Sequence, residues 1–158
     1  MTTATIFALI GVAIASVLGA IGSCFGVSSV ASTGAGLLSK EPARFPQILA
    51  LCALPSTQAL YGLLFGFIVL IRIGLLGGTP LIFSNEIGLA FLLSSLPVGF
   101  ATLFSGITQG WVGSAGIKIL ANKPENFSQA IVLASLIESF AIFGLVISLL
   151  VVFVGIKI

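Results

Sequence analysis

Long apolar stretches alternate with short polar breaks along the whole chain. Four such stretches, at about 6–38, 47–76, 87–121 and 127–154, are separated by breaks rich in proline, glycine, amide and charged residues. Each stretch exceeds the roughly 20 apolar residues that a helix needs to cross a bilayer. Apolar and polar positions do not alternate as they do in barrel strands, and backbone groups in hydrocarbon must be satisfied internally. The pattern therefore predicts an all-α membrane protein with four transmembrane helices.

The two halves of the chain repeat each other. Sliding the chain so that Ser32 meets Ser114 also aligns further identical residues, among them Gly34 with Gly116, Leu38 with Leu120, Pro42 with Pro124, Phe45 with Phe127, Gln47 with Gln129, Leu54 with Leu136, and Gly62 with Gly144. The repeat predicts two tandem helical hairpins, one over 1–79 and one over 80–158. Equivalent helices would run in the same direction, which argues against the inverted repeats of many secondary transporters.

Composition strengthens the membrane assignment and removes several classes of site. The 158-residue chain is 58% hydrophobic and only 6% charged, whereas about a quarter of a soluble domain is charged. A net charge of +2 gives no reason to expect nucleic-acid binding, and without histidine most transition-metal sites are excluded. Cys24 and Cys52 lie in apolar stretches and are expected to be packing residues. The apolar N-terminal stretch is too long for a signal peptide, so we expect it to be retained.

Charge distribution predicts the orientation of the hairpins. The cations around the first and third breaks are Lys40, Arg44, Lys118 and Lys123, whereas Arg72 and Lys157 lie at the opposite side. By the positive-inside tendency, the two hairpin loops are cytoplasmic and both termini lie on the outer side of a cell membrane.

Glycine and other small residues recur at steps of four in the first and third stretches. The first row is Gly11, Ala15, Gly19 and Ser23, and the second is Thr102, Gly106, Gly110 and Ser114. Such rows let membrane helices approach closely. They predict either packing within one four-helix unit or an inner wall shared by many copies, with the second and fourth helices outside.

One carboxylate, Glu138, lies near the middle of the fourth stretch, opposite Ser56 in the repeat. A central acidic residue costs roughly 2.5–3.5 kcal/mol on insertion scales, and ionisable residues at such depth are usually functional. Polar side chains on other predicted helices can serve it: Thr57, Gln58 and Tyr61 on the second, and Gln109 on the third. Glu138 and these side chains therefore form one candidate site.

The donor set of this site consists of oxygen atoms and carries one negative charge. Because Pro55 has no N–H, the Leu51 carbonyl loses its helical hydrogen bond and could add a further oxygen. Hard cations prefer oxygen ligands, and a monovalent ion would leave the site neutral, so Na⁺ fits better than a divalent ion. A proton needs fewer oxygens. A purely structural network with Glu138 permanently protonated is the third interpretation.

Three motifs carry a resemblance to a known family: LPSTQALYG at 54–62, FSGITQG at 104–110 and IESFAIFGLVISLL at 137–150. With the loops KEPARFPQ and NKPENFSQ, the chain resembles the 16-kDa proteolipid, or K (c-type) subunit, of rotary V-type ATPases, in its bacterial sodium-translocating branch. The resemblance implies a Na⁺ site made by five residues: Leu54 through its carbonyl, Thr57, Gln58, Gln109 and Glu138. Tyr61 would help to hold the glutamate. Phe140 departs from relatives that carry tyrosine there.

The resemblance implies a homo-oligomeric rotor ring rather than a catalyst. Its partners would be identical subunits, a static membrane subunit of the a/I type supplying a basic residue, a central-stalk subunit on the cytoplasmic loops, and lipid. ATP would be hydrolysed or made by other subunits, no cofactor is implied, and Na⁺ is the transported ion. The alternatives are the same ring carrying H⁺ and, in another class, a small four-helix proton-coupled exchanger.

Overall fold

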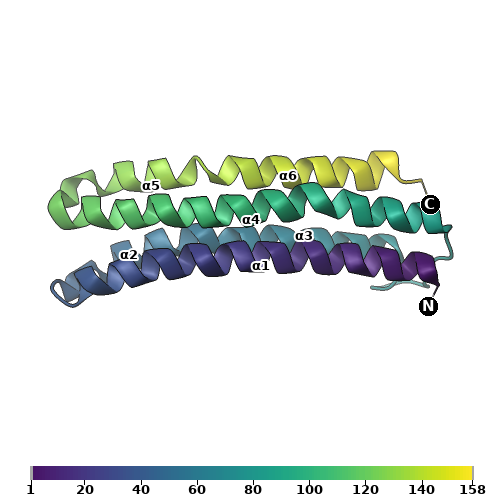
Figure 1. Ribbon diagram of the computed structural model, residues 1–158, viewed down its shortest axis with the longest axis horizontal. Coiled ribbons are helices and arrows are strands. Elements are labelled where there is room, and N and C mark those ends of the chain that lie inside the picture. The colour runs from purple at the N-terminus through teal and green to yellow at the C-terminus, as the bar shows by residue number, and fades with distance from the viewer. Residues whose placement is uncertain (1, 158) are drawn as a thin grey trace.

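Four long helical rods lie side by side in the computed structural model, which describes residues 2–157 (Figure 1). The rods cover Thr3–Leu38, Pro42–Arg72, Asn85–Asn122 and Pro124–Gly155, and each is long and apolar enough to cross a membrane. Both ends of the chain lie at one end of the bundle, and the turns at 39–41 and 123 lie at the other (Figure 1). The all-α membrane fold expected from the sequence is confirmed.

The first and third rods are single helices, α1 (Thr3–Leu38) and α4 (Asn85–Asn122). Both begin at a hydroxyl cap. Thr2 Oγ1 accepts from the Thr5 N–H at 3.2 Å, and Ser84 Oγ accepts from the Ile87 N–H at 3.4 Å. Such caps satisfy amide groups that have no partner in the first helical turn.

The second and fourth rods are built from several pieces. The second rod comprises η1 (Pro42–Arg44), α2 (Phe45–Ala53), η2 (Leu54–Ser56) and α3 (Thr57–Arg72). The fourth comprises η3 (Pro124–Asn126), α5 (Phe127–Ser135), α6 (Glu138–Leu150) and the π-helical η4 (Val151–Gly155). The second rod ends at Arg72, earlier than the apolar stretch, because Gly74 and Gly77 adopt positive φ and turn the chain into the 73–84 connection.

Glycines bring α1 and α4 into close contact along their length. A Cβ added at Gly22 would lie 2.6 Å from the Thr102 carbonyl oxygen, and one at Gly106 would lie 2.6 Å from the Gly22 carbonyl carbon. The second row therefore packs on α1 at Gly22 and Gly26, which lie beside the first row, and the close approach is of the kind that small-xxx-small rows allow. Whether other copies share the same wall stays a prediction.

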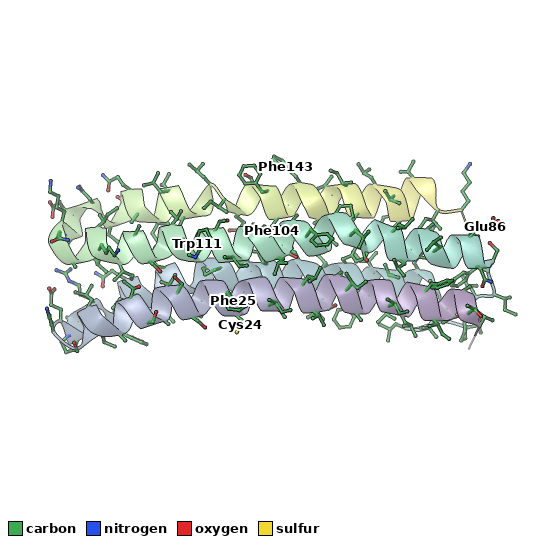
Figure 2. All side chains as sticks on the ribbon, viewed as in Figure 1. Cys24, Phe25, Glu86, Phe104, Trp111 and Phe143 are labelled. Atoms are coloured by element: carbon green, nitrogen blue, oxygen red, sulfur yellow. The ribbon has the colours of Figure 1, made fainter. Side chains whose placement is uncertain are left out.

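The remaining rods pack on this central pair. α3 lies against α1, with Gly62 facing Ala15, and α6 lies against α4, with Gly144 facing Ala101. Large apolar side chains cover the outside, among them Phe25, Phe104, Trp111 and Phe143 (Figure 2). Each of these four is about three-fifths exposed in a single chain. Such a surface requires lipid or further protein around it.

Candidate functional site

The second and fourth rods break at repeat-equivalent positions. In the second, the 3₁₀ segment η2 follows α2 and contains Pro55. In the fourth, a turn at residues 136–137 separates α5 from α6, so that Glu138 is the first residue of α6. In each rod a hydroxyl donates to the leucine carbonyl three residues before it: Thr57 to Leu54 and Ser139 to Leu136, both at 2.8 Å. Glu138 thus stands where the helix is interrupted.

The backbone carbonyl that accompanies Thr57 is that of Leu54. From Pro55 we expected the Leu51 carbonyl instead, but that group faces α4, where a Cβ on Gly113 would lie 3.7 Å from it. The Leu54 carbonyl takes this place because η2 winds as a 3₁₀ helix. This winding turns the Leu54 carbonyl toward the hydroxyl of Thr57, three residues later.

Two buried glutamines join three rods. Gln58 Nε2 on α3 donates to Gln109 Oε1 on α4 at 2.7 Å, and both side chains are fully buried. Gln109 Nε2 in turn donates to the Ala134 carbonyl of α5 at 3.1 Å. Thr57 Oγ1 lies 3.4 Å from Gln58 Oε1 and extends the same chain of contacts. Buried amides need such partners, and this set provides them.

Glu138 is held by Tyr61. The Tyr61 hydroxyl on α3 donates to Glu138 Oε1 at 2.5 Å, and both residues are partly buried. A hydroxyl that donates to a carboxylate makes a short, charge-assisted hydrogen bond. Glu138 also lies in the first turn of α6, where the helix dipole attracts negative charge. Since Thr57, Gln58 and Tyr61 all belong to the first two turns of α3, this helix connects the carboxylate to the glutamine pair.

The break before Glu138 has a tertiary cause that the sequence did not reveal. The Ala134 carbonyl accepts both from Gln109 and, at 3.3 Å, from the Ile137 N–H in a tightened turn. Ser135 Oγ meanwhile donates to the Ile131 carbonyl at 2.9 Å. The break in the fourth rod therefore forms without a proline. The local signals were Ser135 and Ser139, because hydroxyls that bond back along a helix tend to bend it.

A contribution from α1 was also missed. Ser23 Oγ accepts from the Ala59 N–H at 2.9 Å, directly after Gln58. In the sequence Ser23 belongs to the small-residue row, and its hydroxyl alone distinguishes it from the glycines and the alanine of that row.

The arrangement can offer oxygen atoms to a cation. The predicted site residues other than Glu138, namely Leu54, Thr57, Gln58 and Gln109, form one connected group, and Glu138 is linked to their helix through Tyr61. Residues 2–157 contain no group of three His, Cys, Asp or Glu side chains that could hold a metal ion. A site of one carboxylate with amide, hydroxyl and carbonyl oxygens suits a hard monovalent cation.

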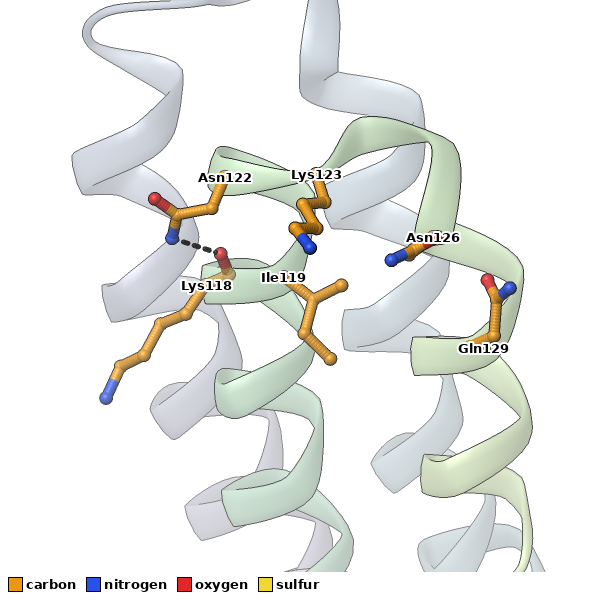
Figure 3. Close-up of a pocket in the computed structure, with 6 residues that line it drawn as sticks. All are labelled: Lys118, Ile119, Asn122, Lys123, Asn126 and Gln129. Carbon is orange, nitrogen blue, oxygen red and sulfur yellow. Dashed lines mark hydrogen bonds between the residues drawn. The ribbon is translucent and has the colours of Figure 1, made fainter.

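A hollow at the hairpin end offers different chemistry. It has a volume of about 410 Å³ and is lined by Lys118, Ile119, Asn122, Lys123, Asn126 and Gln129 (Figure 3). Asn122 Nδ2 donates to the Lys118 carbonyl at 2.8 Å, so this amide is already engaged. Two of its lining residues are lysines, whose positive charge disfavours a bound cation, so the hollow is not a candidate cation site.

Comparison with known proteins gives a consistent family assignment. The family model for the C subunit of ATP synthase matches twice, at residues 10–69 and 92–151. V-type sodium ATPase subunit K from Enterococcus hirae is 43% identical over 93% of this chain and 90% of that protein. A-type ATP synthase subunit K from Methanocaldococcus jannaschii is 35% identical over 82% of this chain and 56% of that protein. The 16 kDa proteolipid of the V-type proton ATPase from Ovis aries is 30% identical over 93% of this chain and 91% of that protein.

Proposed function

Because the chain belongs to the family of ATP synthase C subunits, we propose that it is a rotor-ring subunit that carries Na⁺ across the membrane on Glu138. Its relatives are proteolipid and K subunits of V-type and A-type ATPases, so the chain is a non-catalytic, ion-translocating membrane subunit. Other subunits of the complex would hydrolyse or make ATP.

The observation that carries the choice of Na⁺ is the buried pair Gln58 and Gln109, which α3 connects to Tyr61 and, through it, to Glu138. A carboxyl group that only binds and releases a proton needs one acceptor, whereas Gln58 and Gln109 place two amide oxygens deep in the bundle. With the Leu54 carbonyl and Thr57 they would offer a cation four neutral oxygen ligands in addition to the carboxylate. The relative from Enterococcus hirae, named a sodium ATPase subunit, supports the same choice.

In this mechanism Glu138 enters a half-channel of a static membrane subunit, binds Na⁺, and travels past lipid as a neutral pair. A basic residue of the static subunit would displace the ion into a second half-channel. Moving one charge across 100 mV is worth about 2.3 kcal/mol, so each ATP must be coupled to several ions. Many equivalent sites on a ring of identical subunits supply them, and a central-stalk subunit on the hairpin loops would transmit the torque.

Protection of Glu138 from a carboxyl-reactive carbodiimide tests this function on the purified oligomer. We expect Na⁺ to slow modification at near-neutral pH in a saturable manner, because a bound ion shields the carboxylate, whereas K⁺ at the same ionic strength should not. Exchange of bound ²²Na⁺ on the same sample measures occupancy directly. Modification that is indifferent to Na⁺ over this range would contradict the proposal.

Proton transport by the same ring is the second candidate, favoured by the relatives named proton ATPase proteolipids. In that case Gln58 and Gln109 would only fix the helices. Gln109→Ala separates the two functions in the protection experiment: a sodium site should lose Na⁺ affinity by about tenfold or more, as expected when a group that supports a metal site is lost. Unchanged ion transport in this variant would favour the proton.

A further inference from the structure

Ser23 lies on α1, the one rod that supplies none of the proposed Na⁺ ligands. Its side chain is buried, with 6% of the residue exposed, and its Oγ accepts from the Ala59 N–H at 2.9 Å. Ala59 directly follows Gln58 and lies in the first turn of α3. The hydroxyl of one rod therefore reaches the start of the helix that carries Thr57, Gln58 and Tyr61.

The start of α3 lacks a cap from its own sequence. Its N-cap residue is Ser56, and within the described part of the chain this side chain makes no capping hydrogen bond. Ser56 Oγ donates instead to the Ala53 carbonyl at 2.6 Å. The preceding turn η2 supplies a carbonyl to the first amide of α3, since the Thr57 N–H bonds to the Leu54 carbonyl. Ala59 is the third residue of α3, and the first amide groups of a helix have no carbonyl partner within that helix. In an ordinary N-cap a hydroxyl on the same chain segment accepts this bond. Here Ser23 accepts it from another rod.

The surface of α1 around Ser23 fits the same segment. A Cβ added at Gly19 would lie 2.7 Å from the Gln58 carbonyl oxygen, and one at Gly26 would lie 2.7 Å from Pro55 Cβ. Gly19, Ser23 and Gly26 are spaced to face one side of a helix. α1 therefore contacts the second rod from Pro55 to Ala59 through bare backbone and one hydroxyl.

We propose that Ser23 is a positioning residue for the cation site. It caps α3 from outside, fixes the first turn of that helix against α1, and thereby sets where Thr57 and Gln58 present their oxygens. Ser23 does not touch the ion, and its role rests on the proposed Na⁺ function. Removing the hydroxyl should weaken Na⁺ binding more than the loss of one buried hydrogen bond elsewhere in the bundle.

Ser148 provides a matched control. It is fully buried on α6, and its Oγ accepts from the Val98 N–H of α4 at 3.0 Å, which is the same kind of bond at a similar length. About three turns of α6 separate Ser148 from Glu138. Ser148→Ala therefore removes an equivalent hydroxyl-to-amide bond without touching the start of α3.

The experiment compares Ser23→Ala, Ser148→Ala and the unchanged protein as purified oligomers. Two quantities are measured: the Na⁺ concentration that gives half-maximal protection of Glu138 from carbodiimide, and the midpoint of thermal disassembly. We expect both variants to lower the midpoint, and only Ser23→Ala to raise the Na⁺ concentration, by about tenfold, in line with losses seen for groups that orient metal ligands. If Ser23→Ala does not assemble, Ser23→Cys keeps a weaker acceptor in place and should show an intermediate rise.

Two failures are distinguishable. If Na⁺ does not protect Glu138 in the unchanged protein, the sodium function fails and the role of Ser23 fails with it. If the unchanged protein is protected, and the Ser23 variant needs no more Na⁺ than the Ser148 variant, only the positioning role is overturned.

Discussion

At the residue scale, the site depends on which atom of each polar side chain meets which neighbour. Gln109 uses both ends of its amide, accepting from Gln58 and donating to the Ala134 carbonyl, so one residue connects three rods. Glu138 is joined to α3 by the hydrogen bond that its Oε1 accepts from the Tyr61 hydroxyl. These residues were identified from the sequence because each is a long polar side chain within an apolar stretch. Which of them would pair could not be identified from the sequence, because the pairing depends on the depth and rotation of each helix.

Removal of the Tyr61 hydroxyl tests the contact with the carboxylate. Tyr61→Phe keeps the ring but loses the donor to Glu138, and hydrogen bonds to charged groups contribute about 1.5–3 kcal/mol. We expect the Na⁺ concentration for half-maximal protection of Glu138 to rise by about tenfold or more, since the carboxylate is less well held in place. The rate of carbodiimide modification as a function of Na⁺ measures this.

Thr108→Val is the control for Tyr61→Phe. The Thr108 hydroxyl bonds only to its own helix in the described structure, at 2.8 Å to the Phe104 carbonyl and 3.2 Å to that of Ser105. The variant should bind Na⁺ as the unchanged protein does, and an equal loss in both variants would argue against a specific role for Tyr61.

At the scale of elements, the two interrupted rods differ in how far the sequence predicts them. Pro55 marks the break in the second rod, because a proline removes one hydrogen bond and bends the helix. The break before Glu138 has no such mark, since it arises when Gln109 from another helix takes the Ala134 carbonyl. Local sequence therefore carries a proline mark for one break and none for its repeat-equivalent. The cap that Ser23 provides to α3 escaped prediction for the same reason, because it is a contact between rods.

The close approach of α1 and α4 gives a prediction about stability. Gly106→Ala places a Cβ within 2.6 Å of the Gly22 backbone, so the helices must separate, and overpacking of this kind costs about 1–3 kcal/mol. Gly36→Ala is the matched control, because a Cβ there meets nothing within 4 Å and alanine is the better helix former. The thermal disassembly midpoint of the oligomer should fall for Gly106→Ala and stay level or rise for Gly36→Ala. Equal midpoints would show that the contact is not tight.

At the scale of the whole molecule, the bundle has two chemically different ends. The hairpin end carries Lys40, Arg44, Lys118 and Lys123, and the hollow between α4 and α5 is lined by two of these lysines (Figure 3). The other end carries both termini and the 73–84 connection (Figure 1). The number and order of the rods were predictable because hydrophobic length alone specifies membrane helices. Orientation in the membrane depends on insertion and remains a prediction.

Labelling of single cysteines tests that orientation. With Cys24 and Cys52 replaced by alanine, Ala43→Cys reports on the first hairpin turn and Thr79→Cys on the opposite end, and both positions are exposed. We expect a membrane-impermeant maleimide to label position 43 only in inside-out vesicles and position 79 only in right-side-out vesicles. The reverse pattern would place the hairpin loops outside.

The second rod carries Ser56 at the position where the fourth rod carries Glu138. This difference affects the energetics of a rotor built from this chain. One carboxylate serves four membrane helices, so a full revolution of a ring of given circumference moves half as many ions as it would if each hairpin carried its own. The gear ratio between ion flow and ATP is lowered accordingly. For the same free energy of ATP hydrolysis, each ion can then be driven against a steeper gradient. Such a rotor is better suited to ATP-driven pumping than to ATP synthesis from a small ion gradient.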